Sequence, residues 1–290
     1  MNKTKPNNKM TTRICGPRLK KRDQSIRARQ MLGKYRIEKL IGNGGFAKVY
    51  SALDTIEGIK VALKIPHEHY VDEELMEAFR QEVRLLARLD HPNILVLKDA
   101  NIIDDRLVIA TRLGRETLDD RLTRRMSVPT ALGFAEQMIA AVAYAHDAGL
   151  IHCDIKPENF ILFDDDDIRL ADFGIAKVGT MTIAGSGTGT VGHMSTEQAM
   201  GKPSMRSDVF SLGLIIYRML AGQWPEYPFD WPAPGAGNLR KKRVHPELIA
   251  FVRKSISAKP RDRFANAIRM EEQFEPLHAK ALRHLNRRNR

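Results

Sequence analysis

Short runs of alternating apolar and polar residues begin the patterned part of the chain. They read YRIEKLIG from Tyr35, AKVYSALD from Ala47 and GIKVALKIP from Gly58. Alternation with a period of two is typical of half-buried strands, and the glycines between the runs indicate turns. We therefore predict an antiparallel sheet, which two more strand-like runs between residues 94 and 113 extend.

Helical spacing follows the first three runs. The stretch VDEELMEAFRQEVRLLARLD, residues 71–90, has apolar residues three or four positions apart, and Pro92 blocks its continuation. After Gly114 the pattern is mainly helical, in runs that begin at Thr130, Ser207 and His245. The predicted fold class is α+β, with a small β-rich N-lobe that carries one helix and a larger helical C-lobe. FDDDDIRL, residues 163–170, reads as a hairpin turn, and WPEYPFDWPAPGAG, residues 224–237, as an exposed loop.

Composition narrows the class of protein only slightly. The chain of 290 residues has a net charge of +12, but ten of the first 30 residues and five of the last 13 are Lys or Arg, so the middle is near neutral. We interpret the two ends as solvated basic tails; contact with nucleic acid or an acidic partner is the alternative. The longest apolar run is too short to cross a membrane, and two cysteines favour a reducing, cytoplasmic setting.

A glycine-rich stretch between the first two predicted strands offers a candidate phosphate loop. In IGNGGFAKVY, residues 41–50, Gly42, Gly44 and Gly45 allow backbone N–H groups to approach phosphates closely. Lys64 ends the third strand, and Glu82 follows eighteen residues later in the predicted helix. Each feature alone is weak, but jointly they indicate an ion pair that aims an ammonium group at phosphate oxygens.

Two later motifs supply the remaining chemistry. IHCDIKPENF, residues 151–160, contains Asp154, Lys156 and Asn159, and LADFG places Asp172 thirteen residues after Asn159. Asn and Asp oxygens are hard ligands suited to Mg²⁺. Asp154 would then accept a hydroxyl proton, and Lys156 would neutralise a transferring phosphoryl group.

The ordered set of motifs resembles the eukaryotic-type (Hanks-type) Ser/Thr protein kinases, in their bacterial form, from about Tyr35 to Phe264. The resemblance implies that Asp154 is the catalytic base, Lys156 and Lys64 are phosphate-facing lysines, and Asn159 and Asp172 are the metal ligands. It implies ATP and Mg²⁺ as cofactors, with Mn²⁺ as an alternative metal. The implied nucleotide-binding residues are Ile41, Gly42, Asn43, Gly44, Gly45, Phe46, Ala47, Val49, Lys64, Glu82, Asn159 and Asp172.

The same resemblance indicates the substrate and the supporting residues. Lys156 and Thr190 match the form of the family that phosphorylates Ser and Thr, so the expected partners are protein substrates with Ser or Thr acceptors, and autophosphorylation is expected too. GTVGHMSTEQA, residues 189–199, resembles the substrate-docking segment. Within it Glu197 takes the place of a structural acid that pairs with Arg263, while Asp208 resembles the helix residue that braces the catalytic loop.

The chain departs from the family pattern at several positions. Cys153 replaces the Arg that usually precedes the base (a non-RD kinase), so we expect basal activity without phosphorylation of the activation loop. Ala47 replaces the third glycine, and His193 and Thr196 replace a Tyr and a Pro. Aligning Thr117–Leu118 with the family places Ala110 at the back of the adenine pocket; a shift of one residue would place Thr111 there.

These features predict a domain organisation and two alternatives to an active protein kinase. The predicted parts are a basic tail over residues 1–33, a kinase domain over 35–276 with its lobes at 35–112 and 113–276, and a basic tail over 277–290. A scaffold without transfer activity is disfavoured because every catalytic position is filled. A small-molecule kinase is disfavoured by the docking segment and by Asp208.

Overall fold

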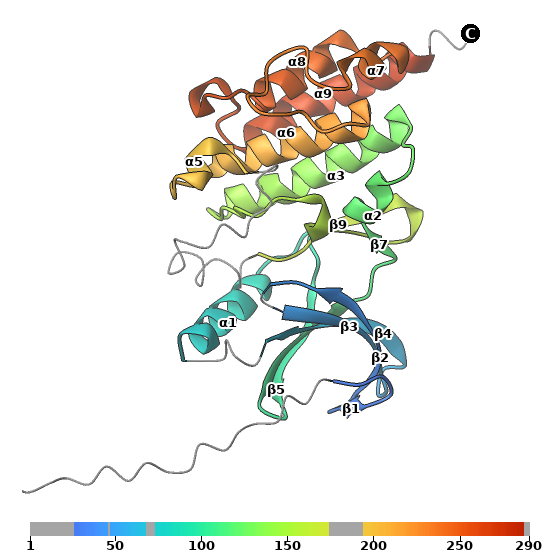
Figure 1. Ribbon diagram of the computed structural model, residues 1–290, viewed down its shortest axis with the longest axis vertical. Helices are drawn as coiled ribbons and strands as arrows, with labels where there is room; N and C mark the ends of the chain where they lie inside the picture. The colour runs from blue at the N-terminus through green and yellow to red at the C-terminus, as the bar shows by residue number, and fades with distance from the viewer. Residues whose placement is uncertain (1–25, 46, 68–72, 174–193, 287–290) are drawn as a thin grey trace, which may run out of the picture.

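The computed structural model describes residues 26–45, 47–67, 73–173 and 194–286. The chain forms two lobes, with a β-rich N-lobe at the bottom of Figure 1 and a helical C-lobe at the top. The predicted α+β fold class is therefore confirmed. The two lobes face each other. The N-lobe side of their boundary carries the glycine-rich hairpin and Lys64, and the C-lobe side carries the loops around Asp154 and Asp172.

A six-stranded antiparallel sheet of order β1-β2-β3-β4-β6-β5 forms the N-lobe. Its strands are β1 (Met31–Leu32), β2 (Tyr35–Asn43), β3 (Ala47–Asp54), β4 (Ile59–Pro66), β5 (Leu97–Ile103) and β6 (Arg106–Arg112). One face buries an apolar cluster that includes Tyr35, Leu63 and Ala110. The alternation read from the sequence thus reflects one buried and one partly open face.

Helix α1 (Glu73–Leu86) packs on the other face of this sheet. Met76 and Val83 of α1 contact a small cluster built on Leu107 and Ile109 of β6. This face also carries Lys64, because Lys64 pairs directly with Ile109 in the antiparallel ladder. The helix therefore lies beside the strand that presents the predicted phosphate-facing lysine.

The C-lobe is built around three helices, α3, α6 and α9, which pack against one another in the upper part of Figure 1. The C-lobe helices are α2 (Leu118–Leu122), α3 (Val128–Asp147), α5 (Thr196–Ala199), α6 (Met205–Ala221), α7 (Ala236–Lys241), α8 (Pro246–Ser255) and α9 (Ala267–Asn286). A small sheet joins β7 (Glu116–Thr117), β8 (Phe160–Leu162) and β9 (Ile168–Leu170). The 3-10 turns η2 (Pro157–Asn159) and η3 (Asp164–Asp166) adjoin its strands in the chain, and a third, η4 (Pro260–Asp262), precedes α9. The acidic stretch at Asp164–Asp167 is the predicted hairpin turn between β8 and β9.

Both predicted tail boundaries are wrong by several residues. Residues 26–33 belong to the N-lobe, since β1 pairs with β2 and Leu32 is fully buried. Helix α9 continues to Asn286, with Leu277 and Ala281 buried against the C-lobe core. Burial of apolar side chains outweighs the basic composition of these segments, because each large apolar side chain stabilises the fold by roughly 1.5–3 kcal/mol when fully buried.

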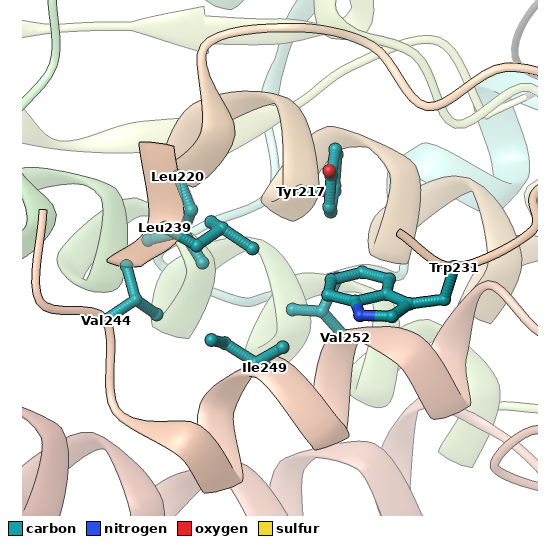
Figure 2. A pocket seen from close by; sticks show the side chains of 7 residues that line it. All are labelled: Tyr217, Leu220, Trp231, Leu239, Val244, Ile249 and Val252. Carbon is teal, nitrogen blue, oxygen red and sulfur yellow. The ribbon is translucent and has the colours of Figure 1, made fainter. Parts of the chain in front are cut away.

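The loop over residues 222–235 is only partly exposed, contrary to the prediction. Tyr227 is 80% exposed, but Phe229 packs on Phe210, with the ring centroids 5.1 Å apart. Figure 2 shows an apolar depression near the end of this loop, where Trp231 faces Tyr217 of α6. Its side chains leave no room for a water molecule, so we assign no ligand to it. They come from α6, the loop, α7, the α7–α8 connection and α8: Tyr217, Leu220, Trp231, Leu239, Val244, Ile249 and Val252.

In the part of the chain that the structure describes, every helix is too short or too polar to cross a membrane.

Candidate active site

Two of the predicted catalytic residues and one predicted metal ligand meet in the loop that precedes β8. The Lys156 ammonium lies 3.1 Å from the Asp154 carboxylate. The side-chain amide of Asn159 donates hydrogen bonds to the backbone carbonyl and to the carboxylate of Asp154, at 2.8 and 3.1 Å. The turn η2 causes this arrangement, because Pro157 starts a tight turn that brings Asn159 back towards Asp154.

Asp208 of α6 holds the backbone on the N-terminal side of this loop. Its buried carboxylate accepts hydrogen bonds from the N–H groups of His152 and Cys153, both at 2.7 Å. A third bond comes from Nε2 of His146 at 3.0 Å. Nδ1 of His146 accepts the N–H of Ala267, so the proton lies on Nε2. A buried carboxylate with three donors rigidly anchors the loop on the C-lobe core.

Asp172 follows β9, next to the loop that holds Asp154, and its side chain contacts the N-lobe. Its carboxylate forms an ion pair with the Lys64 ammonium. Burial alone would raise the pKa of Asp172, but Lys64, with smaller contributions from His152 and Lys156, lowers it below the ordinary value. Asp172 therefore stays ionised at neutral pH. It has a φ of 62°, a left-handed conformation that turns the chain sharply after β9.

The glycine-rich hairpin closes the site from the N-lobe. Ile41, Gly42 and Asn43 lie at the end of β2, and Ala47 and Val49 lie on β3, where Val49 pairs with Lys64. The N–H of Gly44 donates to the carbonyl of Ala47 at 3.0 Å, and Gly44 accepts a bond from Nε2 of His67 at 2.9 Å. An added Cβ at Gly45 would meet open space. Phe46 and the side chain of Glu82 lie outside the described residues.

Asn159 and Asp172 have oxygens suited to a Mg²⁺ ion. Asn159 uses its amide N–H groups for Asp154, so its Oδ1 stays open among the described contacts. The described residues contain no cluster of three or more His, Cys, Asp or Glu side chains that could hold a metal. Such a sparse donor set fits Mg²⁺, which binds through one or two protein oxygens, waters and substrate phosphates.

A buried ion pair joins the predicted docking segment to Arg263. The Arg263 guanidinium donates to both carboxylate oxygens of Glu197, at 2.7 and 3.4 Å. The structure therefore joins two residues that are 66 positions apart and that the sequence predicted to pair. Thr190 and His193 lie outside the described residues, and Thr196 begins the short helix α5.

The strand register corrects the identity of the residue behind the adenine pocket. Ala62 pairs with Thr111, and Leu63 pairs with Ala110. Directly opposed residues share a face of the sheet. Thr111 therefore lies on the face of Lys64 and Val49, whereas Ala110 is 1% exposed within the N-lobe core. The alignment that placed Ala110 in the pocket is wrong by one residue, and one residue moves a side chain to the opposite face.

We expect Thr111 to limit the size of the purine substituent. Thr111→Gly should raise kcat/KM for N6-benzyl-ATP by roughly tenfold, because it relieves an overpacked contact of about 1–3 kcal/mol. Ala110→Gly is the matched control and should leave the selectivity between N6-benzyl-ATP and ATP unchanged. A selectivity gain in Ala110→Gly, with none in Thr111→Gly, would contradict the assigned face.

Two residues that contact the catalytic loop, or the Asp208 that anchors it, were not found from the sequence. Gln198 donates its side-chain amide to the carbonyl of Cys153, and His146 bridges Asp208 to the start of α9. Gln198 carries no sequence signal beyond its place beside Glu197. His146 ends the predicted helix next to an apolar face, where the pattern cannot separate a packed histidine from a surface one.

Comparisons with known proteins agree with this fold and geometry. The family model described as the protein kinase domain matches residues 35–274. A probable serine/threonine-protein kinase of Clostridium acetobutylicum is 32% identical over 81% of this chain and 38% of its own length. The serine/threonine-protein kinase PrkC of Bacillus subtilis is 35% identical over 70% of this chain and 32% of its own length. PknL of Mycobacterium tuberculosis is 32% identical over 84% of this chain and 65% of its own length.

The fold resembles that of solved kinase domains as well. The crystal structure of the PknI kinase domain of M. tuberculosis superposes with a TM-score of 0.67 at 23% identity, over 87% of this chain and 99% of that one. The two-lobed fold is that of the protein kinase class. The chain belongs to the protein kinase family. It spans between about a third and two thirds of the length of these curated relatives.

Proposed function

We propose that this chain is a serine/threonine protein kinase that transfers the γ-phosphate of ATP to Ser and Thr hydroxyls of proteins. The cluster of Asp154, Lys156 and Asn159, with every contact within 3.1 Å, carries this proposal. The contact between Lys64 and Asp172 supports it, since it brings a cation of the N-lobe to an acid of the C-lobe.

The geometry supports a division of roles within that cluster. Asp154 accepts a hydrogen bond from the acceptor hydroxyl and takes its proton as the new P–O bond forms. The bond between the γ-phosphorus and the β–γ bridging oxygen breaks at the same time, and ADP leaves with that oxygen. Asn159 fixes the orientation of this carboxylate, and Lys156 places a positive charge beside it, where it stabilises the transferring phosphoryl group. Catalysis of this kind consists mainly of positioning and charge stabilisation, because the transfer needs little covalent help from the protein.

The cofactors follow from the same residues. The backbone of the hairpin at residues 41–49 would surround the ATP phosphates, with Lys64 as their cation. Asn159 and Asp172 would hold Mg²⁺, with Mn²⁺ as an alternative, and the metal would neutralise charge on the phosphate oxygens. The open Oδ1 of Asn159 and the lowered pKa of the Asp172 carboxyl beside Lys64 support this assignment.

Substrate class and setting are inferred less directly. Lys156 stands two residues after the base, as in kinases that act on Ser and Thr, and the curated relatives are named serine/threonine-protein kinases. The pairing of Glu197 with Arg263 and the anchoring by Asp208 support a protein kinase over a small-molecule kinase. A cytoplasmic setting stays a prediction, and contact of the two basic tails with nucleic acid or an acidic partner stays the alternative to solvated tails.

Phosphate transfer from ATP labelled at the γ-position tests the proposal. The purified chain, Mg²⁺ and myelin basic protein should yield labelled phosphoserine and phosphothreonine, on the chain itself and on the added protein. Nucleotide that raises the melting temperature without any transfer would overturn the proposal and favour the scaffold alternative. Label on a small alcohol alone would favour a small-molecule kinase.

The non-RD position leads to a second expectation. Cys153 supplies no cation beside Asp154, and its N–H is already held by Asp208. A variant with Ala at Thr180, Thr182, Ser186 and Thr188, all outside the described residues, should keep kcat within about threefold of the wild type, because a loop phosphate has no arginine at residue 153 to order. Ser195 is fully buried and is left unchanged. A loss of kcat above about a hundredfold would contradict the expectation.

A further inference from the structure

The peptide unit that precedes the proposed base has an uncommon conformation. Cys153 has a φ of 56°, in the left-handed region that residues with a β-carbon rarely adopt. Such a conformation costs on the order of 1–3 kcal/mol and persists only where neighbouring groups fix it. The contacts that fix Cys153 therefore also fix the direction in which the chain enters Asp154.

Two side chains from different elements hold the backbone of Cys153. Its N–H donates to Asp208 of α6 at 2.7 Å, and its carbonyl accepts the side-chain amide of Gln198 of α5. The thiol Sγ lies 3.7 Å from the carbonyl of Ile151. The bonds from Asp208 and Gln198 thus fix the backbone of Cys153 on both of its sides.

The Gln198 bond acts on the same rigid unit as the base. The carbonyl of Cys153 and the N–H of Asp154 belong to one planar peptide group. That N–H donates to Nδ1 of His152 at 3.3 Å, and Nε2 of His152 donates to the carbonyl of Ala171 at 3.0 Å. Gln198 and His152 therefore hold opposite edges of the plane from which the Asp154 side chain projects.

Helix α5 is itself fixed to the C-lobe core. Glu197, the residue before Gln198, pairs with Arg263 and accepts a hydrogen bond from Ser207 Oγ at 2.8 Å. Arg263 is 4% exposed. An amide at residue 198 is thus held at a defined place, between the end of the docking segment and the catalytic loop.

We propose that Gln198 is a positioning residue for Asp154. The side-chain amide of Gln198 fixes the Cys153–Asp154 peptide, and it thereby helps to order the catalytic loop of a chain that has no arginine at residue 153. The inference rests on the proposed function and deepens it, since it makes the segment around α5 part of the machinery that aligns the base. It requires that the group at residue 198 can donate a hydrogen bond.

Two variants distinguish a hydrogen-bond donor at residue 198 from a side chain that only fills space there. Gln198→Leu removes the donor at similar size and should lower kcat by roughly 3- to 10-fold, the value of one hydrogen bond, with KM for ATP within about twofold. Gln198→Glu cannot donate when ionised but can donate when protonated. The ratio of its kcat to that of the wild type should therefore rise as the pH falls from 8 towards 5.5, while the ratio for Gln198→Leu stays flat.

Dividing the kcat of each variant by that of the wild type at the same pH cancels the effect of groups that titrate alike in all the enzymes. The titratable and charged groups around the Gln198 amide are Asp154, Lys156 and His152 of the loop, Asp208 of α6, and the pair Glu197 and Arg263. Gln137→Leu is the matched control, because the Gln137 side chain bonds Asn93 and the backbone of Ile168 and Asp166, away from the catalytic loop. It should lower the melting temperature and leave kcat unchanged.

The outcomes are decisive in each case. Wild-type kcat in Gln198→Leu, or identical flat pH ratios for the Leu and Glu variants, would overturn the positioning role while leaving the proposed function intact. If Gln198→Leu does not fold, the pH ratio of the near-isosteric Gln198→Glu variant decides alone. Failure of the wild-type chain to transfer phosphate would overturn the proposed function and this inference with it.

Discussion

Asp154→Asn should lower kcat for phosphate transfer by roughly 10²- to 10⁴-fold, the range that a positioned acid–base group contributes. The substitution keeps the size of the side chain, so the fold around Asn159 should survive. What is lost is the carboxylate that accepts the hydroxyl proton and the charge that holds Lys156 at 3.1 Å. Initial rates with saturating ATP and substrate protein measure the effect.

Two controls keep this result specific. Asp147→Asn is a matched substitution at an exposed position at the end of α3 and should leave kcat unchanged. The ATP-induced rise in melting temperature should be the same for Asp154→Asn and the wild type, because nucleotide contacts are expected to come from the hairpin and Lys64. A kcat within tenfold of the wild type would remove Asp154 from the role of base.

Arg263→Met should lower the free energy of unfolding by about 3–5 kcal/mol, as expected when one partner of a buried ion pair is removed. All five N–H groups of the Arg263 guanidinium have acceptors: two oxygens of Glu197 and the carbonyls of Arg206, Ser257 and Ala258. The group also lies over the Phe210 ring, 4.4 Å from its centroid. The variant therefore leaves an uncompensated carboxylate and removes one donor from each of the three carbonyls.

Urea denaturation at several pH values measures this loss. Burial would raise the pKa of Glu197, but backbone N–H donation, Arg263 and Ser207 lower it below the ordinary value. A carboxyl group with a lowered folded-state pKa stabilises the fold above its unfolded pKa of about 4.3, and this contribution disappears as the pH falls through the folded value. The difference in unfolding free energy between the wild type and Arg263→Met should shrink below pH 4.

The double variant Glu197→Leu, Arg263→Met should lose less unfolding free energy than the two single variants lose in sum. Equal losses at pH 7 and pH 3.5 would contradict the assigned pair.

The sequence predicted the catalytic constellation well because ordered motifs carry it. Asp154, Lys156 and Asn159 stand within six residues, and a turn with Pro157 brings them together without help from distant parts of the chain. Glu197 and Arg263 could be paired only by family resemblance, since no local pattern links positions so far apart. Gln198 escaped notice because a hydrogen bond to a backbone carbonyl leaves no constraint on its partner's residue type.

The errors have equally physical causes. Ala110 and Thr111 differ by one position, and in a strand one position is the difference between core and cleft. The basic end of the chain hid the signal for α9, although Leu277, Ala281 and Leu285 recur every four residues. The basic residues led us to predict a solvated tail, whereas the apolar residues determine that this segment forms a helix packed on the C-lobe. The strand at residues 31–32 is too short for any periodicity to show.

The short strand β1 has a consequence for the border of the N-lobe sheet. Met31 and Leu32 pair with the start of β2, and further bonds join Arg29 and Gln30 to the backbone of Ile37, at 2.8 and 2.9 Å. Unpaired strand borders are templates on which other chains can add. The residues that precede Tyr35 thus protect the edge of the sheet. They occupy backbone hydrogen-bonding groups of β2 that could otherwise pair with a strand of a neighbouring molecule. A shortened chain that begins where the family match begins would give up that protection against self-association.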